Sequence, residues 1–230
     1  MLQQVVAGEG GFTALSHLTA RKADTLRWGE ESIVDMLVKR LFLNSELSLY
    51  LDINQERLEA SHEYRLECFY KVFPEQVYSG PNQSPTHRWL YNRTQDGRDV
   101  STPRDVIQLV VRAIQRQQDE FRGDTIGESD HIIGAKALQY GLDELSKAKK
   151  DEFLRAEFPH LWTYIEKFEN GKTEYDGKGL RKLLGANWQF IVDDLISIGL
   201  FKRRGGAGQD ATYWVPHLYR KGLELTQGRA

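Results

Sequence analysis

Apolar residues recur at helical spacing through most of the chain, and the first clear pattern begins after Trp28. The segment opens with two acidic residues and closes with Lys39 and Arg40, an order that the dipole of a helix favours. Its apolar face is expected to contain Ile33, Met36, Leu37 and Leu41. The residues before it have no convincing period, so an irregular N-terminal segment is expected over residues 1–25.

Further helical patterns follow. They cover about residues 46–60, 62–73 and 87–93, with a loop rich in proline, glycine, asparagine and serine from Pro74 to Pro85. Together with the helix described next, they predict a helical domain over residues 26–125.

The start of the next helix contains an arginine in an unusual place. In the stretch S-T-P-R-D-V-I-Q-L, Thr102 can cap the helix, Pro103 suits its first position, and Asp105 suits its first turn. Arg104 puts a cation beside the positive end of the helix dipole, which is unfavourable unless an anion lies nearby. One interpretation is a surface arginine that pairs with Asp99 or Asp105.

A second loop after Arg122, G-D-T-I-G-E-S-D, is the best candidate for a domain boundary. Residues 131–167 then predict one long helix or two helices broken near Pro159. A connecting helix is therefore expected over residues 126–160. Strand signals begin only near residue 173.

The last part of the chain has a different order of elements. Helical patterns end near Phe168, cover G-K-G-L-R-K-L-L, and run from a cap at Asn187 to a stop at Gly199. Two short strands around the glycine-rich tip G-G-A-G-Q-D follow. Three helices and a β-hairpin predict a winged helix-turn-helix over residues 161–230. The expected fold class is mainly α, a helical lid-like bundle followed by this winged helix with its small β-hairpin.

Composition fits a soluble globular protein, with 40% hydrophobic and 28% charged residues. The sequence has no apolar run of about 18 residues, so no membrane-spanning helix and no membrane partner are expected. The N-terminus lacks the pattern of a secretory signal, and a single cysteine, Cys68, forbids an internal disulfide. The expected location is the cytoplasm.

Charge is unevenly distributed along the chain. Residues 171–230 contain 10 Lys/Arg and 6 Asp/Glu, whereas the other 170 residues contain 21 and 27. A basic C-terminal part is compatible with double-stranded DNA as a partner. The candidate nucleic-acid-binding residues are those at the hairpin shoulder and those on the preceding helix, namely Lys202, Arg203, Arg204, Lys178, Arg181 and Lys182.

The predicted recognition helix argues against reading of bases in the major groove. It carries Asp193 and Asp194, which the negative potential of DNA repels. The alternative is that this surface docks on a protein, with Trp188 or Trp214 as an aromatic anchor.

No catalytic or metal-binding residue is expected in this chain. The phrase F-E-N-G-K-T resembles the end of a phosphate-binding loop, but Glu166 occupies the position of its first glycine. The six histidines are scattered, and none lies in a nucleophile or metal motif. A D-G-K pattern at residues 176–178 is too short to indicate a metal-dependent nuclease.

Three stretches resemble parts of bacterial P-loop ATPases of the AAA+ and STAND type. T-P-R-D-V-I-Q-L resembles the sensor-2 motif of their helical lid, and Leu26–Leu41 resembles the first lid helix of origin-recognition-type members. Tyr213–Leu223 resembles the C-terminal winged helix of members linked to defence and signalling. The resemblance implies that Arg104 and Arg40 sense the terminal phosphates of a bound nucleotide.

The sequence departs from this family in two respects. It has Ser101-Thr102 where glycine and a small polar residue are common, and it lacks the phosphate-binding lysine motif and the acids that hold magnesium. The nucleotide-binding core is thus absent from the chain, and no cofactor is expected in it: ATP and Mg²⁺ would bind only with a separate or missing core.

The expected function is that of a non-catalytic C-terminal module of such an ATPase. Its arginines would sense nucleotide in trans or in the full-length protein, and its winged helix would bind DNA or a partner such as the ATPase core. Two alternatives stay open: a stand-alone winged-helix DNA-binding regulatory protein, and a protein-docking module of a bacterial defence system.

Overall fold

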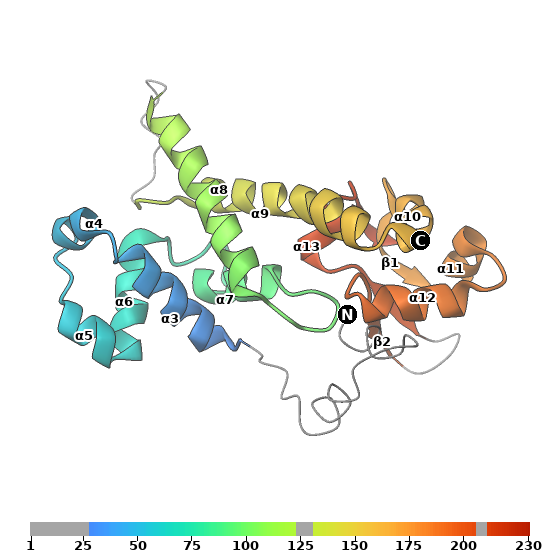
Figure 1. The fold of residues 1–230 in the computed structure, drawn as a ribbon, viewed down its shortest axis with the longest axis horizontal. Coiled ribbons are helices and arrows are strands. Elements are labelled where there is room, and N and C mark those ends of the chain that lie inside the picture. Colours follow the sequence, from blue (N-terminus) through green and yellow to red (C-terminus); the bar gives the residue numbers. More distant parts are fainter. Residues whose placement is uncertain (1–27, 123–130, 206–210) are drawn as a thin grey trace, which may run out of the picture.

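The computed structural model describes residues 28–122, 131–205 and 211–230. It is mainly helical, and a small sheet lies in its C-terminal part (Figure 1). The helices of the first half are α3 (Glu30–Leu41), α4 (Ser45–Tyr50), α5 (Gln55–Ala60), α6 (His62–Val72), α7 (Thr86–Arg93) and α8 (Pro103–Arg122).

The second half contains helices, one of them a π-helix, and strands. The helical segments are α9 (Ala135–Ala148), the π-helix η1 (Lys149–Arg155), α10 (Pro159–Ile165), the 3₁₀ helix η2 (Glu166–Phe168), α11 (Gly177–Leu184), α12 (Trp188–Ser197) and α13 (His217–Arg220). The strands are β1 (Lys172–Asp176), β2 (Lys202–Arg204), β3 (Thr212–Trp214) and β4 (Thr226–Arg229).

Local capping explains where α8 and α12 begin and end. Helix α8 starts at Pro103, and the Thr102 hydroxyl accepts a hydrogen bond from the Asp105 amide at 3.2 Å, as the sequence predicts. Helix α12 stops before Gly199, whose φ of +82° is easily adopted only by glycine. The expected cap at Asn187 is wrong in one respect, because its side chain makes no capping hydrogen bond.

Helix α9 packs along α8 at close range. A Cβ atom at Gly141 would lie 2.4 Å from the carbonyl oxygen of Leu109, so only glycine allows the two backbones to approach this closely. The helix continues into η1, and α10 begins at Pro159, the position where the sequence predicts a break. Since α9 also packs against α13, this helix, which the sequence presented as a connector, is a central packing element.

The sheet has four strands in the order β2-β3-β1-β4. Strands β2 and β3 form the antiparallel hairpin that the sequence predicts, β1 pairs antiparallel with β3, and β4 pairs parallel with β1. Among the described residues, all four strands lie in the C-terminal part, where the sequence places its strand signals, but β1 and β4 extend the predicted hairpin into a larger sheet. Strand β1 reads K-T-E-Y-D, in which only Thr173 and Tyr175 are buried, and β4 is polar throughout, so neither has a strong strand pattern.

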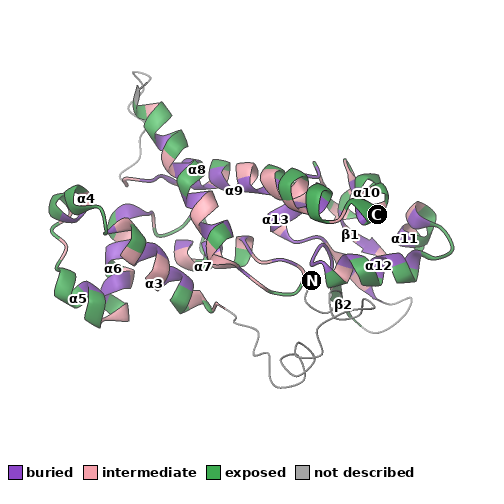
Figure 2. Ribbon diagram, in the orientation of Figure 1, coloured by how far each residue is buried: buried purple, intermediate pink, exposed green. Residues whose placement is uncertain are grey.

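Buried residues from both halves of the chain form one continuous apolar cluster, and the helices turn their buried faces toward it (Figure 2). Four apolar residues of α12 and Ile198 at its C-terminal cap are buried in it: Trp188, Ile191, Val192, Leu195 and Ile198. Among the helices of the described residues, none combines the length and the apolar character needed to cross a membrane.

A tight turn after α7 fixes the first half of the chain against the second. The Gly97 amide donates a hydrogen bond to the Gly199 carbonyl at 2.6 Å, and Arg98 donates one to the Ser197 carbonyl at 3.1 Å. Lys202 on β2 forms an ion pair with Asp99. These contacts place the C-terminal end of α7 beside the sheet.

Candidate functional site

Four cationic or titratable side chains gather around Trp214 where α7 meets the sheet. We call Arg93, Arg204, His217, Arg220 and the indole of Trp214 the cationic cluster. Arg93 ends α7, Arg204 and Trp214 end β2 and β3, and His217 and Arg220 begin and end α13. The cluster thus joins the end of α7 to the hairpin and α13, which come much later in the sequence.

The geometry of the cluster is set by contacts with the indole and the imidazole. The guanidinium carbons of Arg204 and Arg220 lie 4.4 Å and 4.7 Å from the Trp214 ring centroid, which is close enough for cation–π attraction. The rings of Trp214 and His217 meet edge to face at 5.5 Å. Arg93 forms a hydrogen bond to Nε2 of His217, which accepts it as a neutral imidazole.

Positive charge in the cluster is not balanced by carboxylates. Within the described residues, Arg93, Arg204 and Arg220 form no ion pair with an acidic side chain. Burial and the neighbouring arginines lower the pKa of His217 to about 3 and that of Arg220 to about 10. Burial also lowers the pKa of Arg93. The fold therefore holds these cations where their charge is disfavoured.

Most of the cluster lines a polar cleft of about 310 Å³ between α7 and the hairpin. The cleft also contains Asp96 and Asp99, but Asp96 pairs with Arg98 at 2.7 Å and Asp99 pairs with Lys202. Another residue of the cleft wall, Trp89, has a buried indole N–H without a hydrogen-bond partner in the described part of the chain. The cleft thus contains two arginines without an acidic partner among the described residues, Arg93 and Arg204, and one buried N–H donor without a hydrogen-bond partner, that of Trp89.

This arrangement is suited to binding an anion. Guanidinium groups present several N–H donors in a fixed plane, a geometry that matches phosphate oxygens. An anion in the cleft would relieve the repulsion between Arg93 and Arg204, which line it, and would favour their charged forms. Trp214 holds Arg204 and Arg220 in position through its ring face.

The three basic residues predicted at the hairpin shoulder do not all lie on the same face of β2. Side chains alternate along a strand, and Lys202 and Arg204 line the cleft, whereas Arg203 does not. Arg203 pairs in register with Tyr213, which packs on Trp188 in the interior. Arg203 is therefore on the other face of β2 and outside the cluster.

The basic residues of α11 lie elsewhere. Lys178, Arg181 and Lys182 are exposed, and they make no ion pair with any described residue. Their helix packs on β1 and α12, and none of the three lines the cleft around Trp214. They form a second basic surface, separate from the cationic cluster.

The outer face of α12 differs in chemistry from both basic surfaces. It exposes Gln189, Asp193 and Asp194, and Phe190 is 77% exposed. The acids repel phosphate groups, and a large exposed aromatic ring is typical of protein contacts. This face does not have the character of a helix that enters a DNA groove.

Arg104 lies in a separate cleft of about 330 Å³ between the start of α8 and the region of η1. Three carboxylates line the same cleft, those of Asp105, Glu152 and Glu157. Arg104 forms no ion pair within the described residues, because Asp105 pairs with Lys149 at 3.0 Å and Asp99 pairs with Lys202. Neither acid that the sequence offered as its partner is bonded to it.

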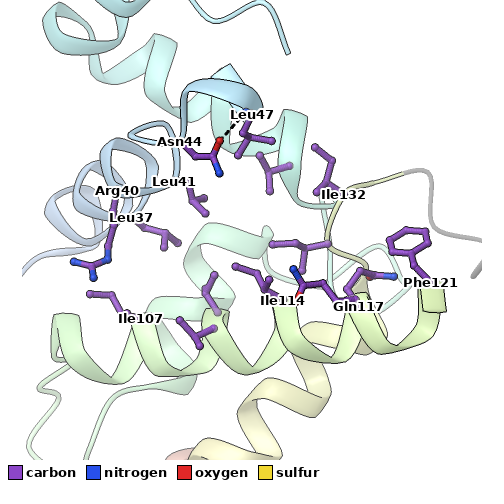
Figure 3. A pocket seen from close by; sticks show the side chains of 15 residues that line it. Leu37, Arg40, Leu41, Asn44, Leu47, Ile107, Ile114, Gln117, Phe121 and Ile132 are labelled. Atoms are coloured by element: carbon purple, nitrogen blue, oxygen red, sulfur yellow. Dashed lines mark hydrogen bonds between the residues drawn. The ribbon is translucent and has the colours of Figure 1, made fainter. Parts of the chain in front are cut away.

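Arg40 and Arg104 line different clefts. Arg40 lines an apolar groove of about 450 Å³ between α3 and α8, together with Ile107 and Phe121 (Figure 3). The two arginines share no cleft, so within this chain they do not converge on one ligand. Nucleotide sensing by Arg104 and Arg40 stays a prediction.

The sequence did not single out Arg93, His217 or Arg220. For His217 and Arg220 the only indication in the sequence was that they lie in the basic C-terminal part. Arg93 lies outside that part and had no indication at all. No cluster of three or more His, Cys, Asp or Glu residues suited to a metal ion occurs in the described ranges. No protein-family model, no curated protein and no solved structure matches the chain.

Proposed function

We propose that this chain is a non-catalytic binding module that contacts the phosphate backbone of duplex DNA through the cationic cluster. The observation that carries the proposal is the convergence of Arg93, Arg204 and Arg220 on Trp214 and His217 without a balancing acid. Fixed guanidinium groups at a surface cleft favour phosphate over neutral ligands.

The order of the C-terminal elements supports a winged helix-turn-helix as the framework. Helix α10, strand β1, helices α11 and α12, and the β2–β3 hairpin follow one another, and β3 lies between β2 and β1. In this proposal Arg204 belongs to the shoulder of the wing. The outward Asp193 and Asp194 keep α12 from the major groove, so binding depends on the backbone and not on the base sequence.

The relation to P-loop ATPases is part of the same proposal. The chain would act as the lid and winged helix of such an enzyme, either within a longer protein or beside a separate core. Asp105, Glu152 and Glu157 line the same cleft as Arg104 and repel a phosphate there. Arg104 would bind nucleotide only if a partner supplied enough positive charge to overcome this repulsion. Binding through the cationic cluster does not depend on that step.

A titration with duplex DNA tests the proposal. The change is Arg204→Glu, and the matched control is Arg203→Glu, which makes the same charge change on the other face of the same strand. We expect fluorescence anisotropy at low salt to show a loss of affinity of roughly tenfold or more for Arg204→Glu and a smaller loss for Arg203→Glu. Equal losses would show that only net charge matters, and would reject the cluster as the site.

A second candidate function rests on the outer face of α12. Exposed Phe190 beside Asp193 and Asp194 fits a protein partner with an apolar pocket and a basic rim, as a docking module of a bacterial defence system would need. The variant Phe190→Ser separates the two functions. It should leave DNA affinity unchanged, and a loss of DNA affinity would place α12 in the DNA interface.

A further inference from the structure

The groove between α3 and α8 has the features of a site for an elongated apolar ligand. One face of α8 lines it from Ile107 to Phe121, a length of about 21 Å at the usual helical rise. Val111 and Phe121 on this face are 44% and 55% exposed. A volume of about 450 Å³ is within the usual range of small-molecule sites.

The amide side chains that line the groove are largely bonded within the protein. Asn44 accepts a hydrogen bond from the Leu47 amide at 3.0 Å, where it caps α4. The Gln117 carbonyl oxygen accepts one from the Gly134 amide at 2.8 Å. The interior of the groove therefore presents hydrocarbon with few free polar groups, which suits a ligand without polar atoms along its length.

Charge at the groove is limited to one residue. Among the described residues that line the groove, Arg40 is the only one with an ionisable side chain, and none is an acid. It lies at the end beside Ile107, and Phe121 lies at the opposite end (Figure 3). Arg40 forms no ion pair with a described residue, so its guanidinium is available to an anion.

We propose that this groove binds a free long-chain fatty carboxylate. The hydrocarbon chain lies along α8 toward Phe121, and the carboxylate pairs with Arg40 at the other end. A linear apolar chain with a single negative end matches a groove with a continuous apolar wall and a single cation. The inference is independent of DNA binding.

Calorimetric titration of the full chain with laurate, dodecanol and dodecylammonium tests this site. These probes share a hydrocarbon chain and differ in charge. We expect laurate to bind with a Kd of roughly 1–100 μM and dodecylammonium to bind much more weakly. Arg40→Gln should weaken laurate about three- to tenfold and leave dodecanol unchanged, because only the carboxylate uses the charge.

Two further variants complete the experiment. Arg112→Gln removes a cation from α8 that does not line the groove, and it should leave laurate binding unchanged. Val111→Glu places an acid in the exposed wall and should abolish laurate binding without unfolding the chain. Circular dichroism checks that each variant keeps its helical content.

Several results would overturn the proposal. Absence of laurate binding would do so, as would equal binding of laurate and dodecylammonium or an Arg40→Gln variant that binds laurate normally. Sedimentation of the unliganded chain as a dimer that Val111→Glu dissociates would identify a second copy of the chain as the occupant, and would also reject the carboxylate.

Discussion

Arg93 and His217 are joined by a hydrogen bond between side chains that lie 124 residues apart in the sequence. The contact connects the end of α7 to the start of α13, and so fixes the first half of the chain to the segment that follows the hairpin. A guanidinium can donate to an imidazole only when the imidazole nitrogen is unprotonated. The state of His217 is therefore tied to the integrity of the cationic cluster.

The first prediction concerns stability at acid pH. The folded-state pKa of His217, about 3, is below the ordinary value, so between about pH 6.5 and about pH 3 the unfolded chain binds a proton that the folded chain does not. Stability from this group is present above about pH 6.5 and falls as the pH decreases through that window. Urea unfolding at about pH 7 and about pH 4.5 should show a loss from this residue of about 2 kcal/mol.

Other acidic groups titrate in the same range, so the comparison must be made against a variant. His217→Gln keeps a hydrogen-bond acceptor for Arg93 and removes the titration. Its stability should depend less steeply on pH than that of the wild type. Parallel pH profiles for the two proteins would show that His217 is not held neutral in the fold.

The second prediction concerns the turn that places α7 beside the sheet. A methyl group added at Gly97 would lie 2.2 Å from the Phe201 carbonyl oxygen, so Gly97→Ala must displace the turn. We expect it to lower the free energy of unfolding by about 2–3 kcal/mol. The control is Gly29→Ala, where a Cβ meets no atom within 4 Å; because Gly29 is the N-cap of α3 and alanine is a poorer cap, a loss of up to about 1 kcal/mol is expected.

Chemical denaturation of the two glycine variants measures both values. If Gly97→Ala proved as stable as Gly29→Ala, the close contact between the turn and the α12–β2 corner would be incorrect. The position of Arg93 beside the sheet, which depends on that contact, would then be in doubt.

The third prediction concerns ATP. The sequence lacks the phosphate-binding loop and the magnesium-binding acids that stabilise the transition state of phosphoryl transfer. The purified chain should therefore release phosphate from ATP at the rate of buffer alone. Turnover that survives Arg104→Ala would place the protein in a different class.

Periodicity and capping residues were enough to predict most helices. Apolar spacing located α3, α6 and α12, and Thr102 with Pro103 marked the start of α8. Strands β1 and β4 were not predicted from the sequence, because their residues are mostly polar. Their pairing depends on β3 and on each other. A short polar strand contains little information about its partners in its own sequence, whether it lies inside the sheet like β1 or at its edge like β4.

The candidate site could be predicted only in part. Arg204 was named from its place at the hairpin, but the alternation that separates it from Arg203 requires the strand register. Arg93 joins the cluster through a tertiary contact that no local pattern indicates. His217 and Arg220 lie within Tyr213–Leu223, the stretch that resembles the winged helix of P-loop ATPases. That resemblance did not indicate that both side chains contact Trp214, because the contacts depend on the fold of α13.

The salt dependence of DNA binding tests the central claim most directly. For wild type, Arg204→Ala and Arg203→Ala, the logarithm of the association constant for duplex DNA is plotted against the logarithm of salt concentration. If Arg204 contacts a phosphate, its removal should reduce the slope by roughly 0.9, and removal of Arg203 should leave the slope unchanged. Equal slopes for all three proteins, or no binding at roughly 50 μM protein in low salt, would contradict the account.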